Sequence, residues 1–150
     1  MPGDRYYIDI AKAVRLWSKD RSRKIGSVIV GEDGEIRSTG YNGMPKGVDD
    51  DVESRHDRPA KYLFTEHSER NAVYQAARAG VSTKGCTLYT WAEGNDIGIC
   101  ADCARAIIQS GIVEVVLQKN EGLNSIWSDS ILAGMEMLGE SKVKVRYFDE

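Results

Sequence analysis

Hydrophobic residues recur along the chain at two kinds of spacing, and these spacings predict alternating helices and strands. Ile10, Ala13, Val14 and Trp17 fall on one face of a helix. The nearly continuous apolar run 112–117 is typical of a strand that is buried on both faces. We therefore expect helices over residues 8–18, 66–79, 101–110 and within 125–138, and strands over residues 26–30, 35–41, 85–91, 112–117 and 143–148.

Turn signals separate most of these elements. Asp33-Gly34 predicts a tight hairpin between the first two strands. Gly80 and Gly111 are typical helix ends. Residues 42–65 show no period and contain two prolines and many charges, so we expect a long loop there. Loops of that length in a small domain are usually functional.

The order of the elements predicts the fold class. Helix, hairpin, helix, strand, helix, strand, helix and strand follow one another, which favours an α/β fold with parallel later strands. We expect a three-layer α/β/α sandwich, whose central mixed sheet has about five strands with helices on both faces. A length of 150 residues suits one compact domain, so residues 1–150 are expected to form a single unit.

Charge and composition exclude several classes of protein. The chain has 20 basic and 23 acidic residues, and this acidic balance argues against a dedicated nucleic-acid binder. A local basic pocket for one phosphate stays compatible with it. No apolar run approaches the roughly 18 residues that cross a membrane, and no apolar stretch typical of a signal peptide follows residues 1–5. We expect a cytoplasmic protein without a membrane partner, in which three cysteines are poorly explained by disulfides.

Two short motifs open two of the predicted helices and carry the chemistry. His67-Ser68-Glu69 opens one, and Cys100-Ala101-Asp102-Cys103 opens the other. One imidazole and two thiolates are the ligand set of a zinc site whose fourth position is open to water. The positive end of each helix dipole favours the thiolate form of the cysteines. Glu69 follows His67 closely enough to share the pocket, where a carboxylate can carry protons.

Each of these residues also has an ordinary structural explanation, and only the combination favours catalysis. A structural zinc normally has four protein ligands. Cys86 is a conceivable fourth ligand, but its predicted buried strand favours a small apolar filler. His56 lies among charged loop residues, which favours a solvated side chain.

The pairing of H-x-E with C-x-x-C is the signature of zinc nucleobase deaminases. Over roughly residues 8–117 the sequence resembles the cytidine/deoxycytidylate deaminase superfamily, and within it most closely the deoxycytidylate (dCMP) deaminases. The likeness is carried by Ser18-Lys19-Asp20 and by residues 26–30, 40–45 and 67–72. Ile99 stands where this family usually has proline before the first cysteine, so we expect a less rigid loop and an intact metal site.

The resemblance implies a cytidine-deaminase-like fold and the hydrolysis of dCMP to dUMP and ammonia, with one Zn²⁺ per chain. His67, Cys100 and Cys103 are the implied ligands. Glu69 is the implied catalytic residue, which takes a proton from water and returns protons to the ring nitrogen and the leaving amine. The implied substrate-binding residues are Asn42, Ser68, Tyr41, Trp91 and Lys46. Further phosphate candidates are Arg55, Arg58, Lys61 and the turn 21–23.

Other functions remain open at this point. The enzyme could act on another amino-bearing base: cytosine, guanine, a modified or triphosphate nucleotide, or adenosine in tRNA. The acidic balance weighs against RNA. A zinc-stabilised binding module without turnover is a third alternative, and Glu69→Gln would separate it from an enzyme. The superfamily also suggests a homo-oligomer, either a dimer or a hexamer.

Overall fold

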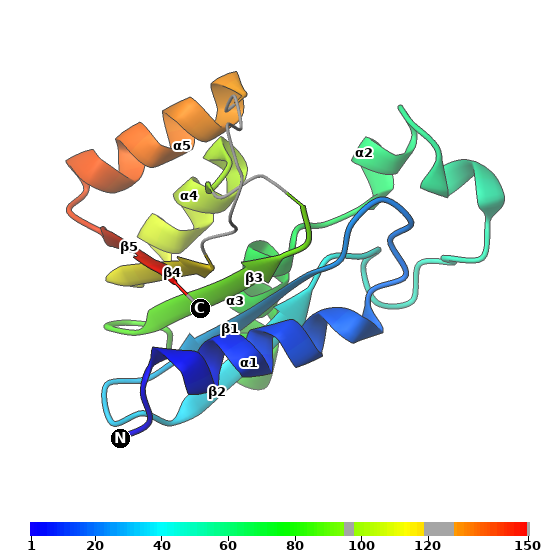
Figure 1. Ribbon diagram of the computed structural model, residues 1–150. Coiled ribbons are helices and arrows are strands. Elements are labelled where there is room, and N and C mark those ends of the chain that lie inside the picture. Colours follow the sequence, from blue (N-terminus) through cyan, green and yellow to red (C-terminus); the bar gives the residue numbers. More distant parts are fainter. Residues whose placement is uncertain (95–97, 119–127, 150) are drawn as a thin grey trace.

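The computed structural model describes residues 1–94, 98–118 and 128–149. Its centre is a five-stranded mixed sheet in the order β2-β1-β3-β4-β5 (Figure 1). β1 (Ile25–Val30) pairs antiparallel with both β2 (Ile36–Tyr41) and β3 (Thr87–Ala92). β4 (Glu114–Gln118) and β5 (Lys144–Phe148) continue the sheet in parallel. The predicted mixed sheet with parallel later strands is confirmed.

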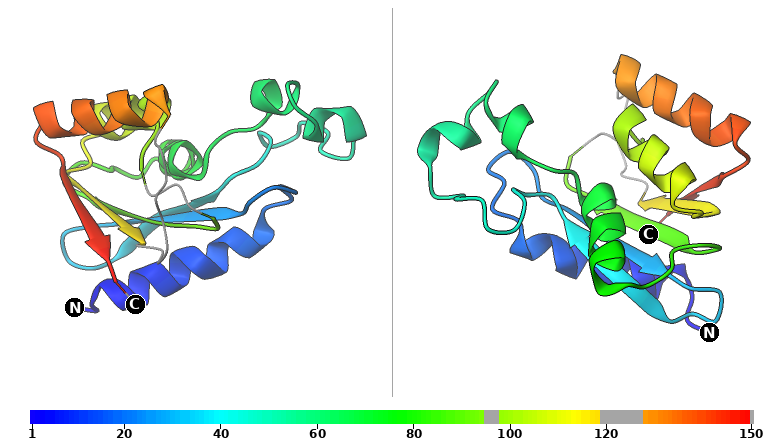
Figure 2. Two further views of the ribbon diagram at one scale, coloured as in Figure 1. Left: turned by 45° about the horizontal axis from the view of Figure 1, so that its top comes forward. Right: turned by 180° about the vertical axis from the view of Figure 1, so that it is seen from behind.

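Helices cover both faces of this sheet, so the predicted three-layer sandwich is also confirmed (Figure 2). Among the helices of the described residues, α1 (Asp4–Val14) lies alone on one face, and it buries Tyr7, Ile8 and Ala11 against that face. On the other face lie α3 (Ser68–Ala79), α4 (Ala101–Gln109) and α5 (Asp129–Glu140). Burial of these two apolar layers is the main stabilising contribution to a sheet of this kind.

The side chains of β3 alternate between the two faces of the sheet. Successive side chains of a strand point to opposite faces. Leu88 belongs to the core under α3 and α4, whereas Tyr89 belongs to the core under α1. By the same alternation Thr90 lies on the α3 side, and Trp91 packs against the α1 cluster.

The structure differs from the sequence prediction at the ends of α1 and in the long loop. The first helix begins at Asp4 and ends in a 3₁₀ turn, η1 (Arg15–Trp17), which leaves Trp17 76% exposed instead of on the buried face. The loop contains η2 (Glu53–His56) and α2 (Lys61–Phe64). Both are single turns, too short to produce a hydrophobic period. The predicted helix start at 125–127 lies outside the described residues.

Within the part of the chain that the structure describes, no helix combines the length and the apolar character needed to span a bilayer.

Candidate active site

The two motif-bearing helices begin at the same place on the sheet. His67 is the N-cap of α3 and Cys100 is the N-cap of α4. Both caps have extended backbone, so their side chains leave the helix at its first turn. The Cys100 sulfur accepts a hydrogen bond from the Cys103 N–H at 3.5 Å. The positive ends of two helices therefore meet at these side chains, which favours negative charge there.

The three predicted ligands are close enough to hold one metal ion. His67 Nδ1 lies 3.3 Å from Cys100 Sγ and 3.5 Å from Cys103 Sγ. All three donor atoms lie within 4.8 Å of one another. Tetrahedral zinc with its usual bond lengths separates nitrogen and sulfur ligands by about 3.5 Å. The donor set and its spacing therefore fit zinc, and Cys86 is not part of the cluster.

Protonation couples these three side chains. The hydrogen bond from the Cys103 thiol, helped by His67 and opposed by burial, lowers the pKa of Cys100 to about 4. The same thiol–thiolate hydrogen bond, together with burial, raises the pKa of Cys103. The hydrogen bond to Cys100 also raises the pKa of His67. Since zinc binds thiolates, metal binding here must release the proton of the Cys103 thiol.

Glu69 stands beside this cluster on the first turn of α3. Glu69 is only 6% exposed, and together with His67 and Cys100 it lines a cavity of about 490 Å³. Ser68 is fully buried behind it and donates a hydrogen bond from its hydroxyl to Glu69 Oε1 at 2.5 Å. Ser68 does not line the cavity, and its hydroxyl contacts Glu69.

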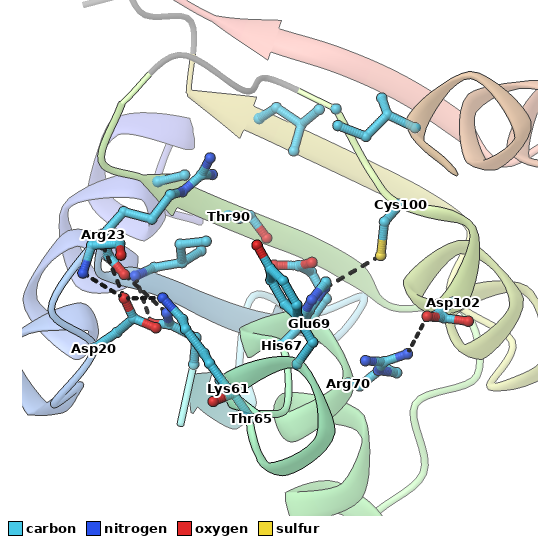
Figure 3. A pocket seen from close by; sticks show the side chains of 18 of the residues that line it. Asp20, Arg23, Lys61, Thr65, His67, Glu69, Arg70, Thr90, Cys100 and Asp102 are labelled. Carbon is cyan, nitrogen blue, oxygen red and sulfur yellow. Dashed lines mark hydrogen bonds and ion pairs between the residues drawn. The ribbon is translucent and has the colours of Figure 1, made fainter. Parts of the chain in front are cut away.

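The cavity has a metal-ligand end and a basic end. Figure 3 shows His67, Glu69 and Cys100 at one end, with Asp20, Arg23 and Lys61 gathered away from them. Arg58 and Ser22 also line the cavity. A cavity of this volume is of the size that holds a small organic ligand.

Asp20 organises the basic end. Its Oδ1 accepts hydrogen bonds from the Lys61 ammonium at 3.0 Å and from the backbone N–H groups of Ser22 at 2.8 Å and Arg23 at 3.0 Å. Burial alone would raise the pKa of Asp20, but these hydrogen bonds together lower it below its usual value. An ionised Asp20 thus fixes Lys61 and the turn 20–23 at the cavity wall.

Asn42 lines the cavity next to this turn and is only 5% exposed. Its Oδ1 accepts from the Ile25 N–H at 2.9 Å, and its Nδ2 donates to the Arg23 carbonyl at 3.0 Å. The Asn42 carbonyl accepts from the Ser18 hydroxyl at 2.7 Å. Asn42 therefore joins the end of β2 to the turn before β1, and one amide hydrogen of Nδ2 remains for a ligand.

Three predicted substrate contacts lie outside this cavity. Trp91 packs on the α1 side of the sheet, because β3 presents Thr90 and not Trp91 to the α3 side, and the guanidinium of Arg15 in η1 lies 4.6 Å from its ring centre. Tyr41 lines a separate cavity of about 270 Å³, which Lys61 and Thr65 also border. Lys46 is exposed and borders neither cavity.

The other basic candidates divide in the same way. Arg58 and Lys61 reach the cavity. Arg55 instead covers the Phe64 ring at 4.5 Å, and Arg21 pairs with Glu53. His56 Nε2 donates a hydrogen bond to the Asp50 carbonyl oxygen, and His56 also lies outside the cavity of Glu69.

Sequence reasoning missed an ion-pair network beside the ligands. Arg70 of α3 contacts Glu66, which precedes that helix, and lies 3.3 Å from Asp102, which stands between the two cysteines (Figure 3). Asp102 also pairs with Arg105. The network joins α3 to α4 at the point where each carries its ligands. Its signal in the sequence was the charge of Arg70, directly after the first motif, and of Asp102, inside the second.

Ile99 is held by packing. It is 1% exposed within the core of α3, α4 and α5. An ideal Cβ at Gly134 of α5 would lie 2.1 Å from the Ile99 carbonyl oxygen and 2.8 Å from the Cys100 carbonyl carbon. The backbone before the first cysteine is therefore clamped by α5, a restraint that the sequence comparison with proline did not suggest.

A sandwich of this topology that brings an imidazole, two thiols and a carboxylate to two facing helix N-termini has the plan of the cytidine-deaminase-like enzymes. The family model described as the cytidine and deoxycytidylate deaminase zinc-binding region matches residues 1–119. The chain belongs to this family, so the predicted family and the predicted enzyme class, a hydrolytic deaminase, are confirmed.

Relatives and solved structures agree with this assignment. The chain is 34% identical over 142 residues to a deaminase encoded in the luxG 3' region of Aliivibrio fischeri, covering 94% of this chain and 90% of that protein. It is 34% identical over 121 residues to mouse deoxycytidylate deaminase, covering 77% of this chain and 64% of the mouse protein. The crystal structure of cyanophage S-TIM5 dCMP deaminase in complex with dCMP and dUMP has the same fold, with a TM-score of 0.75, 24% identity and 99% coverage of both chains.

Proposed function

We propose that this protein hydrolyses dCMP to dUMP and ammonia, with one zinc ion per chain held by His67, Cys100 and Cys103. The observation that carries the proposal is the two-ended cavity, which has a ligand cluster with Glu69 at one end and basic groups at the other. A nucleoside monophosphate has the matching division into a base and a phosphate. The names of the mouse relative and of the cyanophage structure support dCMP as the particular substrate.

At the base end, the chemistry is proton transfer around C4 of cytosine. Zinc, when bound, supplies a Lewis acid that makes water nucleophilic near neutral pH. Glu69 accepts a proton from the attacking water and delivers protons to N3 of the ring and to the departing amino group. Water supplies the oxygen that replaces the amine, so dCMP and water become dUMP and ammonia. The near-complete burial of Glu69 keeps bulk water from competing for these protons.

At the other end, Arg58, Lys61 and the turn at Ser22 and Arg23 are the proposed phosphate-binding groups. Lys61 is fixed by Asp20, so it offers its remaining ammonium hydrogens in a defined direction. Asn42 lies between the two ends and is the proposed contact for the sugar or the base edge. Tyr41, Trp91 and Lys46 have no part in this proposal.

An ammonia-release assay of the zinc-loaded protein tests the function. The panel is dCMP, CMP, dCTP, deoxycytidine, cytosine and guanine, with Glu69→Gln as the blank. We expect rapid turnover of dCMP, little of deoxycytidine, and a loss of at least about 10³-fold in Glu69→Gln, since general acid–base catalysis contributes up to about 10⁴-fold. Turnover of another base in preference to dCMP would refute the substrate, and an active Glu69→Gln variant would refute the mechanism.

The cellular compartment and the oligomeric state of the protein are also proposed. Cys86, Cys100 and Cys103 form no disulfide in the structure, as suits the reducing cytoplasm. We place the enzyme there as a homo-oligomer, and sedimentation of the zinc-loaded protein distinguishes a monomer from a dimer or hexamer.

A further inference from the structure

A chain of three buried hydroxyl groups leads from the sheet to Glu69. Thr90 Oγ1 lies 2.8 Å from Ser27 Oγ, and Ser27 Oγ lies 2.8 Å from Ser68 Oγ. Ser68 Oγ lies 2.5 Å from Glu69 Oε1. Ser27 and Thr90 are direct partners on neighbouring antiparallel strands, and Ser68 begins α3, so three separate elements contribute one hydroxyl each.

These hydroxyl groups are buried in an apolar part of the core, where a polar group lowers stability unless it is hydrogen-bonded. Ser27 and Ser68 are fully buried and Thr90 is 5% exposed. The neighbouring positions on the same strands are apolar, and Ile29 and Leu88 belong to the core beneath α3 and α4. A buried hydroxyl costs free energy unless it is hydrogen-bonded, so alanine or valine would suit packing alone. The three hydroxyls satisfy one another only because all three are present.

The hydrogens of this chain can be assigned in only one direction while Glu69 is ionised. A carboxylate accepts hydrogen bonds and cannot donate, so Ser68 must donate to Glu69. A hydroxyl has one hydrogen, so Ser68 accepts from Ser27, and Ser27 accepts from Thr90. All three hydroxyl groups therefore donate in the direction of the Glu69 carboxylate.

We infer that Ser68, supported by Ser27 and Thr90, is a positioning residue that holds Glu69 Oε1 and presents the other carboxylate oxygen to the reacting atoms. The terminal torsion of a glutamate is soft, so an unrestrained carboxylate would rotate. Restraining one oxygen fixes the plane of both, and the accurate placement of a proton-carrying group affects rate more than binding. This inference rests on the proposed deaminase function and adds a specific structural support for its catalytic residue.

The kinetic test compares variants of the zinc-loaded enzyme. We expect Ser68→Ala to lower kcat for dCMP about 10- to 100-fold while KM and zinc content stay within about twofold of wild type. Thr90→Val, which keeps the shape but removes the hydroxyl, should lower kcat less, and Thr90→Ser should restore it. The matched control is Ser38→Ala, since Ser38 is also buried and donates to α3, at the Ala72 carbonyl, without touching this chain. Wild-type kcat in Ser68→Ala, or an equal loss in Ser38→Ala, would overturn the inference.

A substrate-independent measurement separates failure of this inference from failure of the proposed function. Thermal unfolding of the zinc-loaded Ser68→Ala, Glu69→Ala and double variants forms a double-mutant cycle. If the hydroxyl holds the carboxylate, the Tm loss of the double variant is smaller than the sum of the two single losses. Additive Tm losses would refute the contact even in an active enzyme. If the wild-type protein does not deaminate dCMP but the Tm losses of the variants are coupled, the proposed function is refuted and the Ser68–Glu69 contact is supported.

Discussion

Two basic residues of the long loop, Arg58 and Lys46, look alike in the sequence but lie differently with respect to the cavity. Arg58 borders the cavity of Glu69. Lys46 is exposed and borders neither that cavity nor its neighbour. Both are charged residues of one loop, so a general electrostatic attraction for nucleotides would involve them equally. A direct phosphate contact would involve Arg58 alone.

We predict that Arg58→Ala raises KM for dCMP about tenfold, whereas Lys46→Ala leaves it within about twofold. A charge-assisted hydrogen bond is worth about 1.5–3 kcal/mol, and 1.4 kcal/mol corresponds to a factor of ten. Steady-state kinetics at fixed ionic strength measure both variants. Equal effects of the two substitutions would show that Arg58 acts through the overall field and does not contact the phosphate.

The proposed metal ligands allow a second prediction at this scale, in which Cys86 is the control. Cys103→Ser should lower zinc content from one ion per chain to a small fraction and lower Tm, because a ligand that binds only the folded state stabilises it. Cys86→Ala should keep full zinc content, since Cys86 lies outside the ligand cluster. Elemental analysis after dialysis and thermal unfolding check both. Loss of zinc in Cys86→Ala would reinstate a fourth protein ligand.

The cluster of His67, Cys100 and Cys103 beside Glu69 could be predicted from sequence, because few residue types bind zinc and the motif spacing is local. Contacts to the rest of the cavity could not. Trp91 and Thr90 are adjacent on β3, and only the pairing of that strand decides which of them faces α3. The chain of Ser27, Ser68 and Thr90 joins residues up to 63 positions apart. Its one local signal was a polar residue within each apolar strand.

At the scale of elements, the position of the first cysteine depends on how closely α5 approaches the preceding loop. Gly134 faces the backbone of Ile99 and Cys100 with no room for a Cβ. Gly139, on the same helix, has nothing within 4 Å of its ideal Cβ position. The two glycines therefore make a matched pair in which only one touches the ligand loop.

We predict opposite effects of alanine at these positions. Gly134→Ala should destabilise the protein by about 1–3 kcal/mol through overpacking and weaken zinc binding by moving Cys100. Gly139→Ala should stabilise it by about 0.5–1 kcal/mol through higher helix propensity and leave zinc affinity unchanged. Urea unfolding and competition with a zinc chelator measure the two quantities. Unchanged zinc affinity in Gly134→Ala would mean that the loop adjusts independently of α5.

The elements themselves were predictable where a period of several residues could form. The order of strands and long helices follows from such periods, whereas η2 and α2 are single turns without one. Trp17 matched the apolar face of the first helix, yet the helix changes to a 3₁₀ turn before reaching it. Helix ends depend on backbone partners, and Ser18, which follows the turn, is tied to the distant Asn42 carbonyl.

Across the whole molecule, an ion pair joins the two ends of the described chain. Arg146 of β5 forms two hydrogen bonds with the Asp4 carboxylate of α1, at 2.7 and 3.1 Å. Tyr89 of β3 donates to the same carboxylate at 2.8 Å, and Glu114 of β4 accepts from Arg146 at 2.9 Å. The group therefore connects the α1 layer to the parallel half of the sheet, which carries the site at its other end.

This arrangement predicts a specific dependence of stability on pH. The hydrogen bond from Arg146, opposed by burial and helped by Tyr89, lowers the pKa of Asp4 below its ordinary value of 3.8. A depressed folded-state pKa stabilises the protein fully above the unfolded-state pKa, and this stabilisation is lost as pH falls through the folded-state pKa. Asp4→Asn should therefore cost about 1 kcal/mol at pH 7, a modest value because the pair is partly exposed, and the cost should shrink below about pH 4. Urea unfolding from pH 7 to pH 3 measures this cost.

Asp9→Asn on the same helix is the control, since the exposed pair of Asp9 with Arg5 at 3.7 Å should contribute little at any pH. A cost for Asp4→Asn that stayed constant down to pH 3 would mean that its ionisation does not hold α1 to the sheet.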